Sequence, residues 1–426
     1  MSPIPLPSRA PLQQYSGAET PFDGFPDPAR FSPEFGEAHF RAAARQTNDD
    51  PAPRLLSLHL RLPFDTAETA APADPGRSRA YVHRLARECA IVAPLFDRDR
   101  DVVQLQLDGL GGELPDDLPG ELLHAVSRYF FLSRSDAREF LIALPDGAQD
   151  SQSLAGLVDL GFNRLRLSTP PIAADGEPAA RFARRVGDAR EAGFRSIAVE
   201  LRYACPSIGD TDFDAGLHRL LALRPDRIAL RDEDASLHDR PPGERGLRHA
   251  IATRALLAAD YEALGLDQFV LPQDDLARAL RDGPLHCNGL GFAAQAPTDL
   301  IGLGVGARSR IGDTCFQSYA ELAAWESSVD MGDLPVWRGL RLDDDQRLRS
   351  DVVQALLCTG RVDLDALRVQ HGIVFAEYFR DELAALQPLR DADLLRLDAQ
   401  QLQLGPQGRL ALQAICAPFG ATGRRS

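Results

Sequence analysis

Short apolar runs alternate with amphipathic stretches along the chain from about residue 53 onward. Runs bounded by polar or turn-forming residues predict six strands: Leu55–Leu62, Val102–Leu107, Glu139–Leu144, Arg164–Leu167, Ser196–Tyr203 and Arg227–Leu230. Helical spacing predicts helices between them, at Arg79–Leu95, Glu121–Phe131 and Ser151–Leu160 and near residues 180–192 and 212–223. This alternation is typical of a parallel β/α sheet, either closed into a barrel or open as a doubly wound sheet.

The junctions from helix to strand favour the barrel. Gly161 and Gly193 each end a predicted helix and lead directly into a strand, and Pro225 stops the next helix in the same way. The three junctions lie 32 residues apart, as successive β/α units of a barrel would. Periodicity alone leaves the doubly wound sheet open.

The pattern changes at both ends of the chain. Residues 1–35 hold eight prolines and show little periodicity, which predicts an extended arm before a barrel of residues 36–320. Residues 321–426 are predicted to form a small, mostly helical C-terminal domain of winged-helix type. Its expected elements are helices at Arg347–Leu357, Val362–His371 and Val374–Ala385, a hairpin of Leu394–Leu397 with Leu402–Leu404, and a last helix at Gly408–Ala417.

Composition excludes several classes of function. All 47 basic residues are arginines, so enzymes that need a catalytic or phosphate-binding lysine are ruled out. The net charge of −15 disfavours a nucleic-acid surface, and the predicted wing is not a basic patch. No apolar run approaches the length of a membrane span and no secretory segment follows the N-terminus, so we expect a cytoplasmic protein that is not membrane-bound. The six cysteines are dispersed, with no two closer than 28 residues, and predict free thiols.

Several motifs, in their order along the chain, carry a family resemblance. They are Phe31–Gly36, Leu56–Phe64, Gly161–Leu165, Thr298–Gly306, Ile311–Asp313, Trp337–Gly339, and Gly408–Leu410 leading to Ile415-Cys416. Together they resemble the oxygen-independent coproporphyrinogen III oxidases, radical S-adenosylmethionine enzymes of haem biosynthesis. The resemblance covers about Tyr15 to Phe419. It implies a partial (β/α)6 TIM-like barrel of radical SAM type with a small winged-helix-like C-terminal domain.

The resemblance also implies a 4Fe–4S cluster held by three cysteines just after the first barrel strand. Here those three positions are Asp65, Thr69 and Pro72. A threonine hydroxyl is a poor ligand for iron, and proline has no side-chain donor at all. We therefore predict that the cluster is lost, that no metal is bound, and that Asp65–Pro75 forms an irregular, mobile loop.

Further positions that the resemblance assigns to the cofactor S-adenosylmethionine are altered. The residues found there are His59, Gly109, Ala143, Pro170, Glu200 and Ile311. Ala143 replaces a glutamate and Pro170 a glutamine, and only Glu200 keeps an acidic side chain where the family has aspartate. We accordingly expect neither cluster nor S-adenosylmethionine and assign no catalytic residue.

Other residues are candidates for holding a tetrapyrrole, either porphyrin or haem. The candidate contacts are Gly302, Gly304, Arg308, Arg310, Trp337 and Arg338. Glycine backbone can approach a flat ligand, and arginine can bind propionates. Close packing of a barrel strand explains the glycines as well, a domain-interface anchor explains the Trp-Arg pair, and ordinary surface charge explains the other arginines. His286, Cys287 and Cys315 are candidate axial haem ligands, or simply core and surface residues.

Three functions follow as hypotheses. The first is a catalytically degenerate paralogue that binds a tetrapyrrole, a protein such as an active oxidase, or both, with a regulatory role. The second is an active coproporphyrinogen III dehydrogenase, which the resemblance implies would convert two propionates to vinyl groups on the way to protoporphyrinogen IX. The third is a purely structural or interaction protein without a small-molecule ligand.

Overall fold

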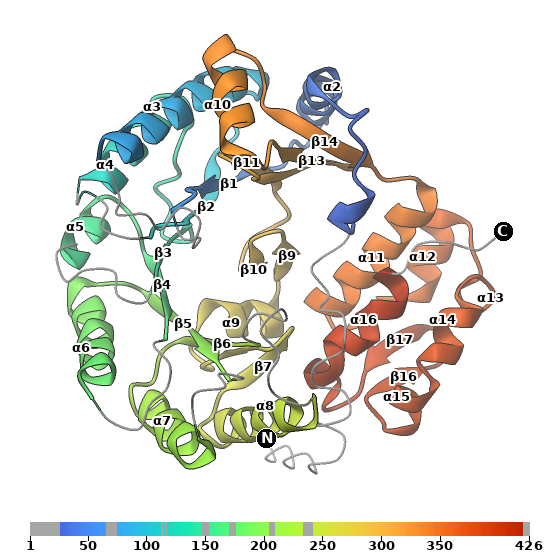
Figure 1. The fold of residues 1–426 in the computed structure, drawn as a ribbon. Helices are drawn as coiled ribbons and strands as arrows, with labels where there is room; N and C mark the ends of the chain where they lie inside the picture. The colour runs from blue at the N-terminus through green and yellow to red at the C-terminus, as the bar shows by residue number, and fades with distance from the viewer. Residues whose placement is uncertain are drawn as a thin grey trace.

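The computed structural model describes residues 26–64, 75–111, 115, 117–145, 153–169, 176–203, 209–232 and 242–420. A curved sheet is surrounded by an outer ring of helices, and a mostly helical domain lies beside it (Figure 1). The partial β/α barrel predicted from the sequence is therefore confirmed.

The centre of the sheet is parallel, in the order β11-β1-β2-β3-β4-β5-β6. These strands are β1 (Leu56–Arg61), β2 (Val102–Asp108), β3 (Glu139–Leu144), β4 (Arg164–Ser168), β5 (Ser196–Arg202), β6 (Arg227–Arg231) and β11 (Asp299–Leu303). The first six match the predicted strands to within two residues at each end.

Antiparallel strands extend both edges of this sheet. On one edge β11 continues into β12 (Arg308–Ile311), β13 (Thr314–Ser318) and β14 (Val336–Arg341), and on the other β6 pairs with β8 (Gln268–Val270), followed by β7 (Glu262–Gly265). Because β14 is part of the sheet, the barrel sheet runs to Arg341, past the boundary expected at residue 320. A separate hairpin of β9 (His286–Asn288) and β10 (Gly291–Ala293) stands against the inner face of the sheet (Figure 1).

Helices pack against the outer face of the sheet. They are α3 (Pro75–Val92), α4 (Leu118–Ser127), α5 (Leu154–Asp159), α6 (Glu177–Ala192), α7 (Asp210–Ala222) and α8 (Pro242–Ala258), joined by α2 (Glu37–Asn48) and α10 (Leu322–Met331). Outward residues such as Leu58, Leu105 and Ile142 are fully buried against them. The strand period of two therefore sends alternate residues to the opposite, inner face.

The C-terminal domain has its own core and a three-stranded sheet in the order β15-β17-β16. Its elements are α11 (Asp344–Cys358), β15 (Arg361–Asp363), α12 (Leu364–His371), α13 (Phe375–Tyr378), α14 (Arg380–Ala385), α15 (Gln387–Asp391), β16 (Leu395–Leu397), β17 (Gln401–Leu404) and α16 (Leu412–Gly420). The predicted hairpin is present, with a third strand at residues where the sequence predicted the start of a helix.

The described part of the N-terminal arm is attached to the barrel. Residues Pro28–Arg30 form a 3-10 turn, and Ser32 pairs with Gly339 of the edge strand β14 through two backbone hydrogen bonds of 2.7 and 3.0 Å. Within the described residues, no helix is long and apolar enough to span a membrane.

Candidate functional site

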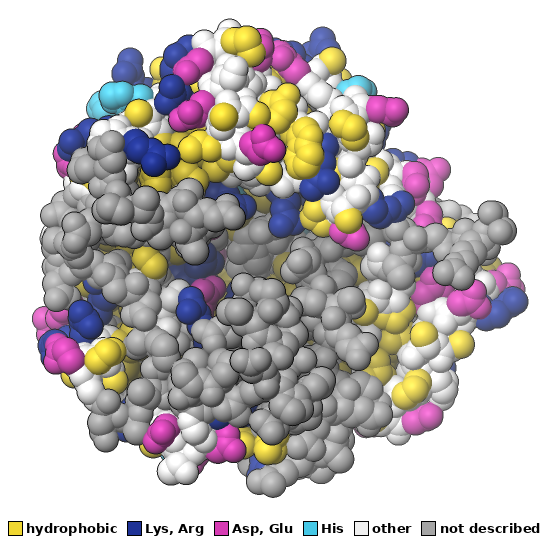
Figure 2. All heavy atoms as spheres, in the orientation of Figure 1, with side chains coloured by type: hydrophobic (Ala, Val, Ile, Leu, Met, Phe, Trp, Pro, Cys, Tyr) yellow, Lys and Arg dark blue, Asp and Glu magenta, His cyan; other side chains and the backbone are white. Residues whose placement is uncertain are grey.

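The inner faces of β2–β6, together with β8 and the hairpin, enclose a polar pocket, called here the lumen. Its lining residues include Gln104, Gln106, Glu139, Arg164, Arg166, Ala198, Glu200, Arg227, Ala229 and Arg231, with Leu290 and Phe292 from the hairpin. Dark-blue basic and magenta acidic side chains lie together in the hollow near the centre of the face in Figure 2. The lumen is where the parallel strands present their inward side chains, so it is the candidate functional site.

A histidine–carboxylate pair lies beside the lumen, on the neighbouring strands β1 and β2, although neither residue lines the pocket itself. His59 Nε2 lies 2.9 Å from Asp108 Oδ2, and Gln106 Nε2 donates to the same oxygen at 2.8 Å. Burial opposes ionisation of Asp108, but His59, Gln106 and Arg166 outweigh it and hold the pKa of this carboxyl below its ordinary value. Asp108 is therefore an anion at neutral pH.

Two arginines and a glutamate continue this polar wall across β4, β5 and β6. Arg166 lies 3.7 Å from Asp108 and 3.8 Å from Glu200, and Arg231 lies 3.6 Å from Glu200. Arg166 can reach toward Asp108 because the residue beside it on β3, its sheet partner Ala143, is small. These separations are ion pairs without direct hydrogen bonds.

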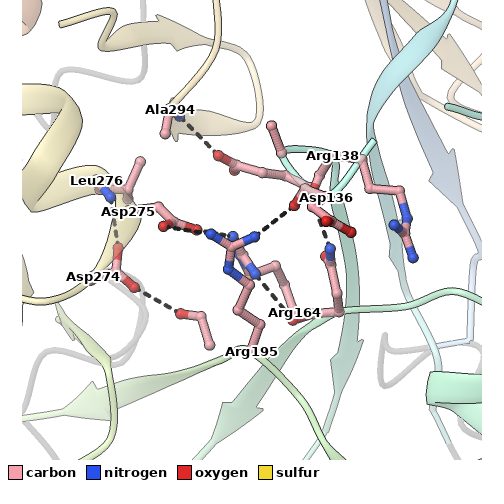
Figure 3. Close-up of polar contacts among 12 residues, drawn as sticks. Asp136, Arg138, Arg164, Arg195, Asp274, Asp275, Leu276 and Ala294 are labelled. Carbon is pink, nitrogen blue, oxygen red and sulfur yellow. Dashed lines mark hydrogen bonds and ion pairs between the residues drawn. The ribbon is translucent and has the colours of Figure 1, made fainter. Parts of the chain in front are cut away.

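The floor of the lumen is closed by the N-terminus of α9 (Asp275–Asp282), where the preceding Asp274 caps the helix through the backbone N–H of Leu276 at 2.8 Å. Arg164 and Arg195 both contact Asp275, the latter at 3.0 Å (Figure 3). Asp274 accepts from Ser196 Oγ at 3.0 Å and lies 2.9 Å from Arg227 Nε. These pairs are short, so we interpret the floor as a structural plug, in which Arg164 Nε and Arg227 Nη2 are buried without a hydrogen-bond partner among the described residues.

The hairpin β9–β10 covers the inner face between the floor and β11. Asn288 Nδ2 donates to Gln104 at 2.8 Å, and the backbone N–H of Ala294 donates to Glu139 at 2.9 Å. The hairpin therefore separates the lumen from a second pocket.

This second pocket, called here the side pocket, lies between the hairpin, β11–β13 and α11. It is lined by Cys287, Asn288, Arg308, Arg310 and Cys315 among others, with Phe31 of the arm at one wall. Arg310 Nη2 donates to Ser350 Oγ at 3.0 Å. The structure thus brings together four of the residues that the sequence proposed for tetrapyrrole contact or haem ligation.

The ionisation of the candidate haem ligands differs. Burial raises the pKa of Cys287 to about 12 and also raises the pKa of Cys315, so both thiols stay protonated at neutral pH. Burial, Arg310 and Arg54 lower the pKa of His286 to about 4, so its imidazole is neutral. The neutral imidazole is the form that binds iron, but His286 is not among the residues that line the side pocket, whereas Cys287 and Cys315 are.

The remaining candidate contacts lie elsewhere. A Cβ on Gly302 would stand 2.3 Å from the carbonyl oxygen of Arg308, and one on Gly304 would stand 2.3 Å from that of Arg61. Both glycines therefore approach protein backbone, which is the close-packing interpretation. Arg338 stacks on Trp337 with its guanidinium 4.3 Å from the ring centroid, and neither residue lines the side pocket.

Three of the positions that the resemblance assigns to the cofactor, His59, Ala143 and Glu200, lie on the inner faces of β1, β3 and β5. Of these three, only Glu200 lines the lumen. Gly109 follows β2 with a φ of +75°, and a Cβ there would stand 1.7 Å from the carbonyl oxygen of Leu62. Ile311 is a buried core residue of β12. Pro170 lies outside the described residues.

The donor chemistry does not fit a 4Fe–4S cluster. The loop predicted at Asp65–Pro75 lies outside the described residues, except for Pro75 itself, where α3 begins. It contains Asp65, Thr69 and Pro72, so the conclusion that these three residues cannot hold a cluster rests on their side-chain chemistry. Among the residues that the structure does describe, no three His, Cys, Asp or Glu side chains are grouped so as to hold a metal ion.

Sequence reasoning missed the arginines of the lumen. Arg164 and Arg166 stand two apart on β4, and Arg227 and Arg231 stand four apart on β6, so each pair shares one face of its strand. This period-two recurrence of arginine was the available signal, and it points to the inner face because the residues between are apolar. Asp108, directly before the glycine turn at the end of β2, was a second such signal.

Known proteins resemble this chain over nearly its whole length. A family model described as "HemN C-terminal domain" matches residues 342–411. The oxygen-independent coproporphyrinogen III oxidases of Salmonella typhimurium strain LT2 and Escherichia coli strain K12 are each 30% identical to it, covering 96% of this chain and 94% of the relative. A solved structure described as "Coproporphyrinogen III oxidase (HemN) from Escherichia coli is a Radical SAM enzyme" superposes with a TM-score of 0.82 at 29% identity, covering 94% of this chain and 96% of that one.

Proposed function

This chain belongs to the oxygen-independent coproporphyrinogen III oxidase family, whose radical SAM barrel it shares, and from that premise we propose that it binds a porphyrin-class tetrapyrrole without performing radical chemistry. The observation that carries the proposal is the set of residues Asp65, Thr69 and Pro72 at the positions that the resemblance assigns to the cluster cysteines. A cluster needs thiolates, and this set offers one carboxylate where three thiolates are required.

The side pocket supports the binding half of the proposal. Arg308 and Arg310 line it together, and guanidinium groups bind carboxylates such as propionates through paired hydrogen bonds. The pocket also carries apolar surface from Phe31 and Leu300, which suits the face of a macrocycle. The proposed output is sequestration of a tetrapyrrole or regulation within the haem pathway.

The absence of radical chemistry is tested by anaerobic reconstitution with iron and sulfide. We expect the wild-type protein to bind no stoichiometric iron, to show no cluster absorbance near ~400 nm, and to form no 5′-deoxyadenosine from S-adenosylmethionine under reducing conditions. The triple variant Asp65→Cys/Thr69→Cys/Pro72→Cys is the matched control and is expected to assemble a cluster. Catalytic formation of 5′-deoxyadenosine by the wild-type protein would establish the active-oxidase hypothesis instead.

Tetrapyrrole binding is tested by titrating the purified protein with coproporphyrin III and with haem while following the Soret band. We expect a shifted band for the wild-type protein and about 10-fold or greater weakening in Arg308→Gln/Arg310→Gln, because charged hydrogen bonds to propionates are lost. Arg341→Gln, an exposed arginine on β14, is the control. Absence of any shift in the wild-type protein would leave the interaction-protein hypothesis.

A further inference from the structure

We propose that the upper lumen contains a second anion site, in which Arg166 and Arg231 bind a carboxylate group beside Glu200. Both guanidinium groups line the lumen pocket and reach it from β4 and β6. Neither arginine lines the side pocket, so this site is separate from the pocket proposed for the tetrapyrrole.

The first observation is that these two guanidinium groups are incompletely satisfied. Within the described residues, Arg166 and Arg231 make only ion pairs of 3.6 to 3.8 Å and no hydrogen bond to another side chain or to backbone. Two arginines of the floor, Arg195 and Arg227, instead donate direct hydrogen bonds to their aspartates at 3.0 and 2.9 Å, although Nη2 of Arg227 has no partner in the described part of the chain. The arginine side chains are accessible as well, with relative exposures of 24% and 50% for Arg166 and Arg231.

The second observation is the charge on this face. Arg166 and Arg231 both approach Glu200, at 3.8 and 3.6 Å, and Arg166 also lies 3.7 Å from Asp108. Two carboxylates therefore already stand beside these guanidinium groups. They repel a dianionic phosphate more strongly than a carboxylate, so the site favours a monoanion.

The third observation is the space beneath the two arginines. Ala198 and Ala229 line the same pocket between the polar floor and the upper arginines, and each presents only a methyl group. A short carbon chain attached to the carboxylate can therefore extend downward against these methyl groups. The chemistry selected is a carboxylate on a short aliphatic chain, which a free small acid or a tetrapyrrole propionate equally provides.

The experiment measures binding of isotopically labelled propionate by saturation-transfer NMR, and in parallel the affinity for coproporphyrin III and for its tetramethyl ester. The variants are Arg166→Gln and Arg231→Gln, with Arg184→Gln on the outer surface of α6 as the control for charge removal. Ala229→Leu fills the space while leaving every arginine in place, so it tests the site even where an arginine variant folds poorly. Ala192→Leu on α6 is the matched control for added volume.

We expect carboxylate binding to weaken about 10- to 100-fold in each arginine variant and in Ala229→Leu, and to stay unchanged in both controls. Binding of propionate itself by the wild-type protein identifies a free acid as the ligand. If the lumen variants lose affinity for coproporphyrin III but not for its tetramethyl ester, the ligand is a tetrapyrrole propionate. Equal binding of propionate and coproporphyrin III by the wild type and all lumen variants would overturn the site. Coproporphyrin III binding that responds only to Arg308→Gln/Arg310→Gln, together with propionate that does not bind or binds all lumen variants equally, would overturn it too, while leaving the tetrapyrrole proposal intact.

Discussion

Glu88 is a carboxyl group buried between the barrel and its outer helices. It lies on α3 with 1% exposure, and its Oε2 accepts the backbone N–H of Gly304 at 2.8 Å and the indole N–H of Trp325 at 3.2 Å. Tyr81 stacks on Trp325 with ring centroids 4.6 Å apart. Burial raises the pKa of Glu88 from 4.5 to about 8, and the two hydrogen bonds only partly oppose that effect.

The raised pKa makes the folded state lose stability as pH rises. Because the folded protein holds a proton that the unfolded chain releases above pH 4.5, the contribution is fully present below that value and is lost as pH rises toward about 8. One pH unit corresponds to about 1.4 kcal/mol, so this group alone lowers the free energy of unfolding by about 3 kcal/mol between pH 5 and pH 7.

Glu88→Gln tests this reasoning, since the amide keeps an oxygen for Gly304 and Trp325 but cannot ionise. Urea unfolding of wild type and variant at pH 5, 6 and 7 should show the variant gaining about 3 kcal/mol relative to wild type across that range. Glu191→Gln, an exposed residue of α6, is the control and should follow the wild-type profile. A difference between Glu88→Gln and wild type that is constant with pH would refute the argument.

Two substitutions elsewhere test the packing. Gly302→Ala should destabilise the protein by about 1–3 kcal/mol or more in urea unfolding, because the added Cβ would meet the carbonyl of Arg308. Gly187→Ala is the control: it lies in α6 with open space around it and should stabilise the protein by about 0.5–1 kcal/mol. A neutral Gly302→Ala would contradict the close-packing interpretation. Arg100→Met should cost about 3–5 kcal/mol in the same assay, because Asp299, 2.6 Å away and 1% exposed, would be left as a buried unpaired charge. A loss below about 1 kcal/mol would show that Asp299 is compensated by its other donors.

The barrel strands were predictable because their outward faces bury aliphatic side chains at a period of two. Leu58 and Leu60 of β1, like Phe140 and Ile142 of β3, are almost completely buried against the helices. The strands between residues 260 and 341 escaped prediction, since most are short and depend on tertiary pairing. The turn between β7 and β8 needs positive φ at Leu266 and Asp267, residue types that give little local signal.

The candidate site was predictable only in part. The sequence identified Arg308, Arg310 and Cys315, and the structure places them around one pocket because β12 and β13 pair as a hairpin. The lumen pairs depend instead on register between separate β/α units, as when Ala143 stands in register with Arg166 and opens its path to Asp108. Such an arrangement follows from the sheet and cannot be read from local sequence.

The two faces of each barrel strand have separate roles. On β1 the outward residues Leu58 and Leu60 pack the core, while the inward His59 contacts Asp108 of the neighbouring strand β2. Because stability depends mainly on the outward set, inward positions can change with little effect on the fold. The Arg231 side chain is half exposed and makes no hydrogen bond within the described residues. Substitutions at Arg231 should therefore alter ligand affinity while leaving the unfolding free energy within about 0.5 kcal/mol of wild type.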